Sequence, residues 1–331
     1  MPDANIALLI IIFIAALAFG TSNGMNDAAN AVAASIGSRA IRPRNALALA
    51  AIFNMVGALT GIEVAKTIGK GIIANPDFTI ALAAVTSAVV WTLVATYKGL
   101  PISVSHSLVS GLVGAGLATS STIGWGSFGK TLVAVVAAPT LGFLGAFALM
   151  VILLWAFYKL KPGISNDIFR KGQWLTTAFL SYAHGKNDGQ MPIGLMVMGL
   201  GIYKGVDYFA AGNQIPLWII IIGALSISLG TAFGGWRVIK TMGFKVTALQ
   251  PIHGFAAETA AAGVIEVASH FGIPVSTTHC GVATVIGVGA TNRLSAVRWG
   301  LARSIVFAWV LTFPVCMGLG YGLAKLFEPI L

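Results

Sequence analysis

Two nearly identical stretches occur in this chain of 331 residues: PISVSH at residues 101–106 and PVSTTH at residues 274–279. Each places a proline, two or three hydroxyl side chains and a histidine in the same order within apolar sequence. A proline disfavours helical angles at the preceding residue and is tolerated in the first turn of a new helix. Each stretch therefore predicts a break in the chain followed by the start of a helix.

A second motif is also doubled, and it precedes the first one in each half of the chain. NGMNDAANA occupies residues 23–31, and HGKNDGQMP occupies residues 184–192. Both contain Gly-x-Asn-Asp. Two motifs that recur in the same order indicate an internal duplication.

The composition assigns the chain to a membrane. It is 57% hydrophobic and only 9% charged, whereas about a quarter of the residues of a typical soluble domain are charged. Most of the apolar runs reach the ~20 residues that a helix needs to span a bilayer. A cleaved signal peptide is the alternative for the first run, but no basic residue precedes that run. The runs cover residues 5–24, 45–62, 79–97, 102–118, 131–157, 174–200, 215–235, 247–269, 281–290 and 300–324.

The net charge of +10 does not indicate nucleic-acid binding, because the basic residues lie in groups between the apolar runs. Basic loops remain in the cytoplasm. Their distribution predicts a multi-pass protein of the cell membrane with both termini on the extracytoplasmic side and the 158–172 connection inside. The basic groups are Arg39, Arg42 and Arg44; Lys159, Lys161, Arg170 and Lys171; Arg237, Lys240 and Lys245; and Arg293 and Arg298.

The predicted fold is an all-α polytopic membrane protein with about 10–12 transmembrane or re-entrant helices. Residues 1–157 are predicted to form one repeat and residues 173–331 a second, inverted repeat, joined by a cytoplasmic connection at 158–172. The pair 79–97 and 102–118 either crosses twice or dips in as a hairpin, and the prolines favour the hairpin. Inverted repeats with broken helices are typical of alternating-access transporters.

A helix that starts inside the membrane directs its unpaired N–H groups and the positive end of its dipole at an anion. Two such tips, reaching in from opposite leaflets, would surround an oxyanion with donors. The alternative is that these hydroxyls only cap the helices. The candidate anion ligands are Ser103, Ser105, Ser107, Ser276, Thr277 and Thr278.

The doubled Asn-Asp pairs are candidate cation sites. A carboxylate in a membrane helix is costly and normally faces a partner or a watery path. Carboxylate and amide oxygens together suit Na⁺ or another hard cation. Helix breaking by Asn-Asp at a membrane exit is the structural alternative, and Glu258 is either a further ligand or an interior anchor. The candidate cation ligands are Asn26, Asp27, Asn187, Asp188 and Glu258.

Three further residues are candidate accessories. Lys186, which has no counterpart in the first copy, either pairs with Asp188, attracts an anion or extends toward the interface. His106 and His279 either carry protons or fix the turns. Three other histidines lack metal-ligand spacing among themselves, so no zinc site is assigned to them. They are His184, His253 and His270.

The stretches GMNDAANA, HGKNDGQ, LPISVSH and IPVSTTHC resemble the signatures of the Pit-type inorganic phosphate transporter family over nearly the whole chain. The resemblance implies a secondary transporter, not an enzyme, that moves phosphate with Na⁺ or H⁺. It implies that Asp27 and Asp188 are the two signature aspartates. It also implies that the Ser and Thr residues lie at hairpin tips and that Glu258 is an acidic family position. A homodimer is expected on the same ground. The second signature departs from the family at NDGQMP, and Asn54 stands where several members have glutamate.

The expected function is therefore import of inorganic phosphate coupled to Na⁺, with no other cofactor and no nucleic-acid partner. Two monovalent cations would offset a divalent phosphate, because burying unpaired charge is costly. The alternatives are coupling to H⁺ with phosphate, a metal–phosphate complex or sulfate as cargo. An intramembrane hydrolase is less favoured, because adjacent Ser105 and His106 are poorly placed as a nucleophile–base pair. A passive anion channel is the last alternative.

Overall fold

The computed structural model describes residues 2–330, and it is almost entirely helical. No strand occurs among the described residues, where a single isolated bridge joins Ile73 to Ile123. The elements are α1 (Pro2–Gly37), α2 (Pro43–Ala58), α3 (Glu63–Lys66), η1 (Thr67–Gly71), α4 (Phe78–Lys98), α5 (Val104–Ala118), α6 (Trp125–Ala156), α7 (Pro162–Asp188), α8 (Gln190–Lys204), α9 (Leu217–Phe233), α10 (Trp236–Lys240), η2 (Thr241–Lys245), α11 (Pro251–His270), α12 (Thr277–Asn292), η3 (Leu294–Ala296) and α13 (Trp299–Phe327).

Four of these helices are long and apolar enough to cross a membrane: Asn5–Gly37 of α1, α4, α6 and α13. Two bent pairs raise the number to six if each pair is one span. α2 meets α3 and η1 at 67°, and α9 meets α10 and η2 at 58°. The prediction of an all-α polytopic membrane protein is confirmed.

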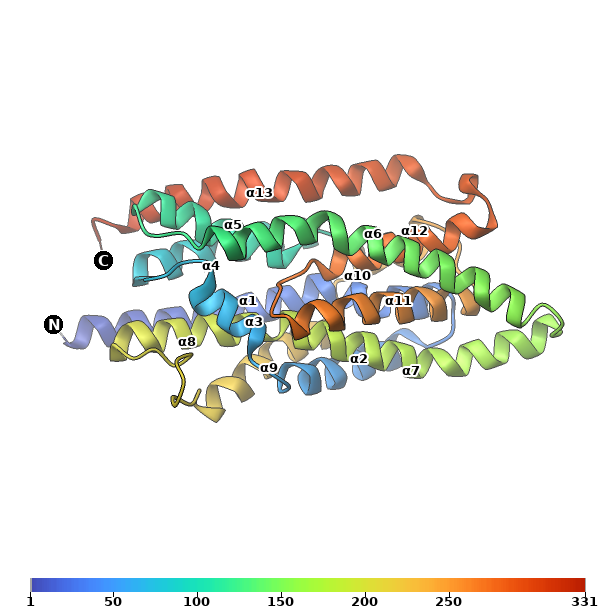
Figure 1. Cartoon of the computed structure of the whole chain (residues 1–331), viewed down its shortest axis with the longest axis horizontal. Coiled ribbons are helices and arrows are strands. Elements are labelled where there is room, and N and C mark those ends of the chain that lie inside the picture. Colours follow the sequence, from blue (N-terminus) through green and yellow to red (C-terminus); the bar gives the residue numbers. More distant parts are fainter. Residues whose placement is uncertain (1, 331) are drawn as a thin grey trace.

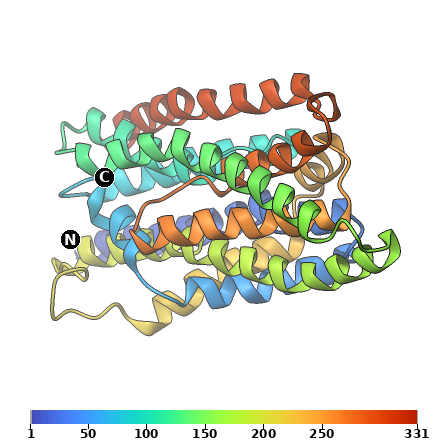
Figure 2. The same ribbon diagram turned by 45° about the vertical axis from the view of Figure 1, so that its right-hand side comes forward.

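The helices lie side by side along the long axis of the molecule (Figures 1 and 2). α1 begins and α13 ends at the same end of the bundle, which we call the terminal end. The link from α6 to α7 lies at the opposite end, which we call the connection end. α7 begins at Pro162, so most of the predicted 158–172 connection is helical and extends α7 outward.

The same order of elements occurs twice along the chain. A long helix is followed by a bent pair, a helical hairpin and a second long helix in α1–α6. The same order recurs in α7–α13 when α7 and α8, which meet at Gly189, are taken together as the counterpart of α1. The helix that contains each Asn-Asp motif packs on the bent pair of the other half. α1 packs on α9, and α7 packs on α2. Gly24 of α1 lies against the backbone of Ile227, and Gly185 of α7 lies against the backbone of Asn54.

The two hairpins, α4–α5 and α11–α12, contain the predicted chain breaks. Gly99 and Gly272 adopt left-handed φ angles of 70° and 65° and end the first helix of each hairpin. Glycine is favoured there because it has no Cβ to clash. A short extended segment with a proline follows, and the second helices begin at Val104 and Thr277, as the prolines predict.

Candidate functional site

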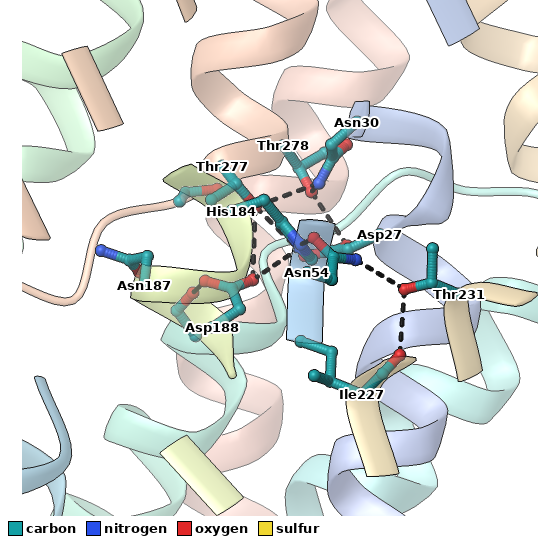
Figure 3. A network of polar contacts seen from close by, with 12 residues as sticks. Asp27, Asn30, Asn54, His184, Asn187, Asp188, Ile227, Thr231, Thr277 and Thr278 are labelled. Atoms are coloured by element: carbon teal, nitrogen blue, oxygen red, sulfur yellow. Dashed lines mark hydrogen bonds and ion pairs between the residues drawn. The ribbon is translucent and has the colours of Figure 1, made fainter. Parts of the chain in front are cut away.

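Two carboxylates from different halves meet in the interior of the bundle. Asp27 lies on α1 and Asp188 is the last residue of α7, and their exposed fractions are 1% and 0%. The hydroxyl of Thr277 lies 3.2 Å from Oδ2 of Asp27 and 3.3 Å from Oδ2 of Asp188. One hydroxyl at the start of α12 thus bridges the two aspartates (Figure 3).

Hydroxyls from both hairpin tips reach this pair. Thr278 donates to Oδ1 of Asp27 at 3.2 Å. Ser105, from the first hairpin, lies 3.4 Å from Oδ1 of Asp188 and donates at 3.0 Å to the carbonyl of Val275 in the second hairpin. Each aspartate therefore contacts the hairpin of the opposite half, and the two tips contact one another. The structure brings together five of the predicted residues: Ser105, Thr277, Thr278, Asp27 and Asp188.

The asparagine before each aspartate holds the hairpin of its own half. Nδ2 of Asn26 donates to the hydroxyl of Thr96 at 2.8 Å, and Nδ2 of Asn187 donates to the hydroxyl of Ser269 at 3.0 Å. Thr96 and Ser269 lie in the last turns before the glycines that end α4 and α11. Each Asn-Asp pair therefore connects both hairpins. The asparagine amide contacts the hairpin of its own half, and the aspartate carboxylate contacts the hairpin of the opposite half.

Four buried amide oxygens of the two Asn-Asp motifs lack a hydrogen-bond donor among the described residues. They are the Oδ1 atoms of Asn23, Asn26, Asn30 and Asn187. Nδ2 of Asn30 donates to the hydroxyls of Thr277 and Thr278 at 3.1 Å and 2.8 Å. A buried acceptor without a donor is costly, and a cation would satisfy it. These oxygens and the two carboxylates are the ligand types that hard cations prefer.

His184 completes the cluster, and the sequence reasoning missed it. Its Nε2 lies 3.3 Å from Oδ2 of Asp188 and 3.7 Å from Oδ2 of Asp27. One ligand atom from each of the three residues lies within 4.8 Å of the others. The signal was present in the sequence, because a residue four positions before Asp188 shares its helix face.

A chain of hydrogen bonds fixes which nitrogen of His184 carries a proton (Figure 3). Thr231 gives its only hydroxyl proton to the carbonyl of Ile227 at 2.9 Å and accepts from Nδ2 of Asn54 at 2.7 Å. Oδ1 of Asn54 then faces Nδ1 of His184 at 3.0 Å. An amide oxygen can only accept, so Nδ1 is the donor. Nε2 is left to face the carboxylates, either as a second donor of an imidazolium or as a lone pair for a metal ion.

The other predicted anion ligands make contacts within their own helices. Oγ of Ser103 accepts the N–H of His106 at 3.2 Å, and Oγ of Ser276 accepts the N–H of His279 at 3.0 Å. These two serines are N-caps. Ser107 donates back to the carbonyl of Ser103 at 2.9 Å. The capping alternative thus describes Ser103 and Ser276, while Ser105, Thr277 and Thr278 face the aspartates.

Glu258 is buried outside the carboxylate cluster. It accepts hydrogen bonds from the hydroxyls of Thr176 and Thr177 on α7, the second at 3.1 Å. Together with Asn30 it lines a small cavity between α1, α11 and α12. Glu258 and the cluster are therefore separate positions with Asn30 between them.

The three accessory candidates do not contact the aspartates directly. Lys186 forms an ion pair with Glu266 on α11. The rings of His106 and His279 lie edge to face with centroids 4.9 Å apart, and His279 stacks on Trp309 at 3.9 Å. All four nitrogens of these two rings lack hydrogen-bond partners among the described residues. The two histidines pack the hairpin starts against each other.

Comparison with known proteins identifies the family. Residues 23–320 match the model of the phosphate transporter family. A probable low-affinity inorganic phosphate transporter of Rhizobium meliloti (strain 1021) is 42% identical, covering 94% of this chain and 95% of the relative. The Bacillus subtilis (strain 168) protein of the same name is 37% identical, covering 96% of each chain.

A solved structure described as the sodium-dependent phosphate transporter matches the fold. Its TM-score is 0.90 at 27% identity, over 98% of this chain and all of the other. The relatives are transporters, not enzymes, and the cluster of oxygens at the hairpin tips is consistent with carrying an anion. Together with the doubled motifs, these matches show that the chain belongs to the phosphate transporter family.

Proposed function

We propose that this phosphate transporter is a symporter that couples phosphate import to Na⁺ by alternating access. The observation that carries the proposal is the juxtaposition of Asp27 and Asp188 at one hydroxyl, that of Thr277, in a closed interior site. Two buried carboxylates so close together repel one another, and a divalent phosphate beside them adds further negative charge. At least two monovalent cations are needed to balance the phosphate.

Side chains of the same interior site supply ligands for these cations. The carboxylates of Asp27 and Asp188 supply oxygen ligands, and so do the amide oxygens of Asn26, Asn30 and Asn187, which lack donors among the described residues. Nε2 of His184 lies beside the two carboxylates. Carbonyl and carboxylate oxygens near broken helices bind Na⁺ in other transporters. The likeness to a sodium-dependent phosphate transporter supports the same choice.

Phosphate would bind to the tips once cations occupy the carboxylates. Ser105, Thr277 and Thr278 carry donors at the starts of α5 and α12, where the helix dipoles also favour an anion. In the structure these hydroxyls donate to carboxylates or to the carbonyl of Val275. Cation binding would weaken the bonds to the carboxylates and free the same protons for phosphate oxygens. This order of events, cations first and phosphate second, makes uptake depend on Na⁺.

Access would alternate between the two ends of the bundle. We infer two inverted repeats, residues 1–157 and 173–331, because elements and cross-half contacts recur in the same order. The basic residues between α1 and α2 and between α6 and α7 lie at the connection end, which we place in the cytoplasm. Both termini are then extracytoplasmic, in the cell membrane.

The test is phosphate uptake by the purified protein in liposomes under an imposed Na⁺ gradient. Asp27→Asn and Asp188→Asn keep the shape of each side chain and remove its charge. Each should lower Na⁺-driven uptake about 100-fold, the equivalent of ~2.7 kcal/mol. The matched control is Asp207→Asn, in the loop after α8. Retained Na⁺-driven uptake in both aspartate variants contradicts the cation assignment.

A second candidate function is H⁺-coupled uptake of phosphate or a metal–phosphate complex. The observation in its favour is His184, because one nitrogen and two carboxylate oxygens within 4.8 Å suit a divalent metal ion. Uptake in Na⁺-free buffer, driven by a pH gradient and dependent on an added divalent cation, would favour it over Na⁺ coupling.

A further inference from the structure

A third doubled motif lies in the bent helix pairs. AKTIG occupies residues 65–69 of α3 and η1, and IKTMG occupies residues 239–243 of α10 and η2. In both copies the threonine is the first residue of a π-helical turn just after the bend. Such turns are rare and frequently occur at functional sites. The site described above uses neither threonine.

The hydroxyl of each threonine lies within hydrogen-bond distance of the hairpin tip in the opposite half. The hydroxyl of Thr67 lies 2.7 Å from the carbonyl oxygen of Gly272, and that of Thr241 lies 3.1 Å from the carbonyl oxygen of Gly99. Each hydroxyl also lies near the carbonyl four residues earlier in its own helix, at 3.3 Å for Thr67 and 3.0 Å for Thr241. The bent pair of each half thus contacts the hairpin of the other half through the same type of threonine–glycine pair.

The two glycines accept these bonds at equivalent points of the hairpins. Both are the left-handed residues that end the first hairpin helix, and in both the next N–H bonds back into that helix. A Cβ at Gly99 would press on Arg237, and one at Gly272 would press on Glu63. Each bent pair therefore packs directly on the turn that leads to the phosphate-facing hydroxyls.

We propose that Thr67 and Thr241 are positioning residues for transport, each holding the hairpin tip of the opposite half closed over the site. The proposal rests on alternating access as proposed above. Asn26 and Asn187 tie each hairpin to its own half, whereas the threonines tie it to the other half. Movement of one half against the other must break a threonine contact and leave an asparagine contact intact.

The two contacts lie on opposite sides of the site. α3 lies on the terminal-end side of α2, and α10 lies on the connection-end side of α9 (Figure 1). Loss of the Thr67 contact frees the second hairpin and opens the site toward the terminal end. Loss of the Thr241 contact frees the first hairpin and opens the site toward the connection end.

The first experiment measures phosphate uptake in liposomes under the ion conditions that are optimal for the parent protein. Thr67→Val and Thr241→Val remove the hydroxyl but keep the branched shape. Each should lower the maximal rate about tenfold, and Thr67→Ser and Thr241→Ser should restore it. The matched controls are Thr131→Val and Thr140→Val, whose hydroxyls bond only to their own helix. Parent-like rates in both Val variants, or equal losses in Ser variants or controls, overturn the proposal.

The second experiment uses the two native cysteines, both buried, as reporters of hairpin opening. Cys280 lies in the second hairpin, directly after His279. Cys316 lies on α13 against the first hairpin, and its carbonyl accepts a hydrogen bond from Ser87 of α4. Labelling by a small thiol reagent is followed at each cysteine by peptide mass spectrometry. Thr67→Val should speed labelling of Cys280, and Thr241→Val that of Cys316, each roughly fivefold, about the worth of one hydrogen bond.

Equal labelling of both cysteines in both variants, or labelling unchanged from the parent, overturns the proposal. These results are distinguishable from failure of Na⁺ coupling. The labelling experiment needs no ion gradient, and the uptake experiment compares each variant with the parent under the same ions. If the parent proves to use protons, both measurements keep their meaning.

Discussion

The two halves of this transporter share the residues that hold its shape and one aspartate each, and they differ in the side chains around those aspartates. Asn26 and Asn187 each anchor a hairpin, and Gly24 and Gly185 each admit a neighbouring helix. Around these shared positions the copies diverge. The second copy has histidine and lysine at positions 184 and 186, where the first copy has asparagine and methionine at positions 23 and 25.

The difference indicates how a duplicated fold can acquire one asymmetric site. Architecture needs the same backbone contacts in both halves, so the residues that make them recur. The aspartates recur as well and meet in one interior site, so the side chain that faces both of them is needed only once. His184 faces both aspartates, while the equivalent Asn23 has both polar side-chain atoms unpartnered among the described residues.

The largest effect is expected where the halves are alike. An added Cβ at Gly24 or Gly185 would overlap the carbonyl oxygen of Ile227 or Asn54. Backbone cannot yield as a flexible side chain does, so Gly24→Ala and Gly185→Ala should each destabilise the protein by about 3 kcal/mol. Thermal unfolding in detergent measures the loss.

The control for this prediction is Gly318→Ala, in α13, where an added Cβ meets nothing within 4 Å. It should leave the unfolding temperature unchanged or raise it, because alanine favours helices. A marked difference between Gly24→Ala and Gly185→Ala would show that the two halves are not packed alike.

A smaller effect is expected from His184→Asn, which gives the second copy the residue of the first. The variant loses the ring nitrogen that lies 3.3 Å from Asp188 and 3.7 Å from Asp27. Uptake should fall about tenfold, the equivalent of ~1.4 kcal/mol, because the electrostatic contact with both carboxylates is lost. Initial rates of phosphate uptake at several Na⁺ concentrations measure the loss.

The matched control is His270→Asn, at the exposed end of α11. It should transport like the parent. Parent-like uptake by His184→Asn would mean that the two copies are interchangeable at this position and that the histidine has no part in the charge balance.

The smallest effect is expected from Lys186→Met, which restores the residue of the first copy. Lys186 and Glu266 form a partly exposed ion pair, with exposed side-chain fractions of 13% and 28%. Such pairs contribute about 0.2–1 kcal/mol. The uptake rate should therefore stay within a factor of about three of the parent rate, and the free energy of unfolding should change by no more than about 1 kcal/mol.

Glu266→Leu and the double variant complete a cycle for the same measurements. The double variant should match the parent more closely than either single variant, because no charge is then left without its partner. A severe loss of uptake in Lys186→Met alone, unrelieved in the double variant, would instead assign the lysine to anion binding.

Much of the fold was predictable because its signals are local. Pro101 and Pro274 predict the hairpin breaks, and the doubled motifs indicate the duplication. The bends after Ala58 and Phe233 were not predicted, because the apolar runs at 45–62 and 215–235 gave no sign of the helical segments that continue beyond them. The extension of α7 into the predicted 158–172 connection was not predicted either.

The site was predicted in part for the same reason. Asp27, Asp188, Ser105, Thr277 and Thr278 stand in repeated motifs, and they meet. Ser103 and Ser276 belong to the same motifs, yet they cap helices. A shift of one or two positions along the chain decides whether a hydroxyl accepts from the N–H groups of the helix or faces the aspartates. The pairing of His184 with Asp188 could have been predicted from their i,i+4 spacing on one helix, whereas its contacts with Asp27 and Asn54 join different helices.

The amino-acid sequence by itself determined the membrane environment, the helical class, the duplication and the two hairpin breaks. All of these follow from hydropathy and from backbone preferences that act over a few residues. Only the tertiary structure decided which half supplies each partner: Asp27 with Thr278, Thr67 with Gly272, and His184 between the two aspartates. Contacts between residues more than a hundred positions apart depend on how helices pack, and no local pattern records that packing.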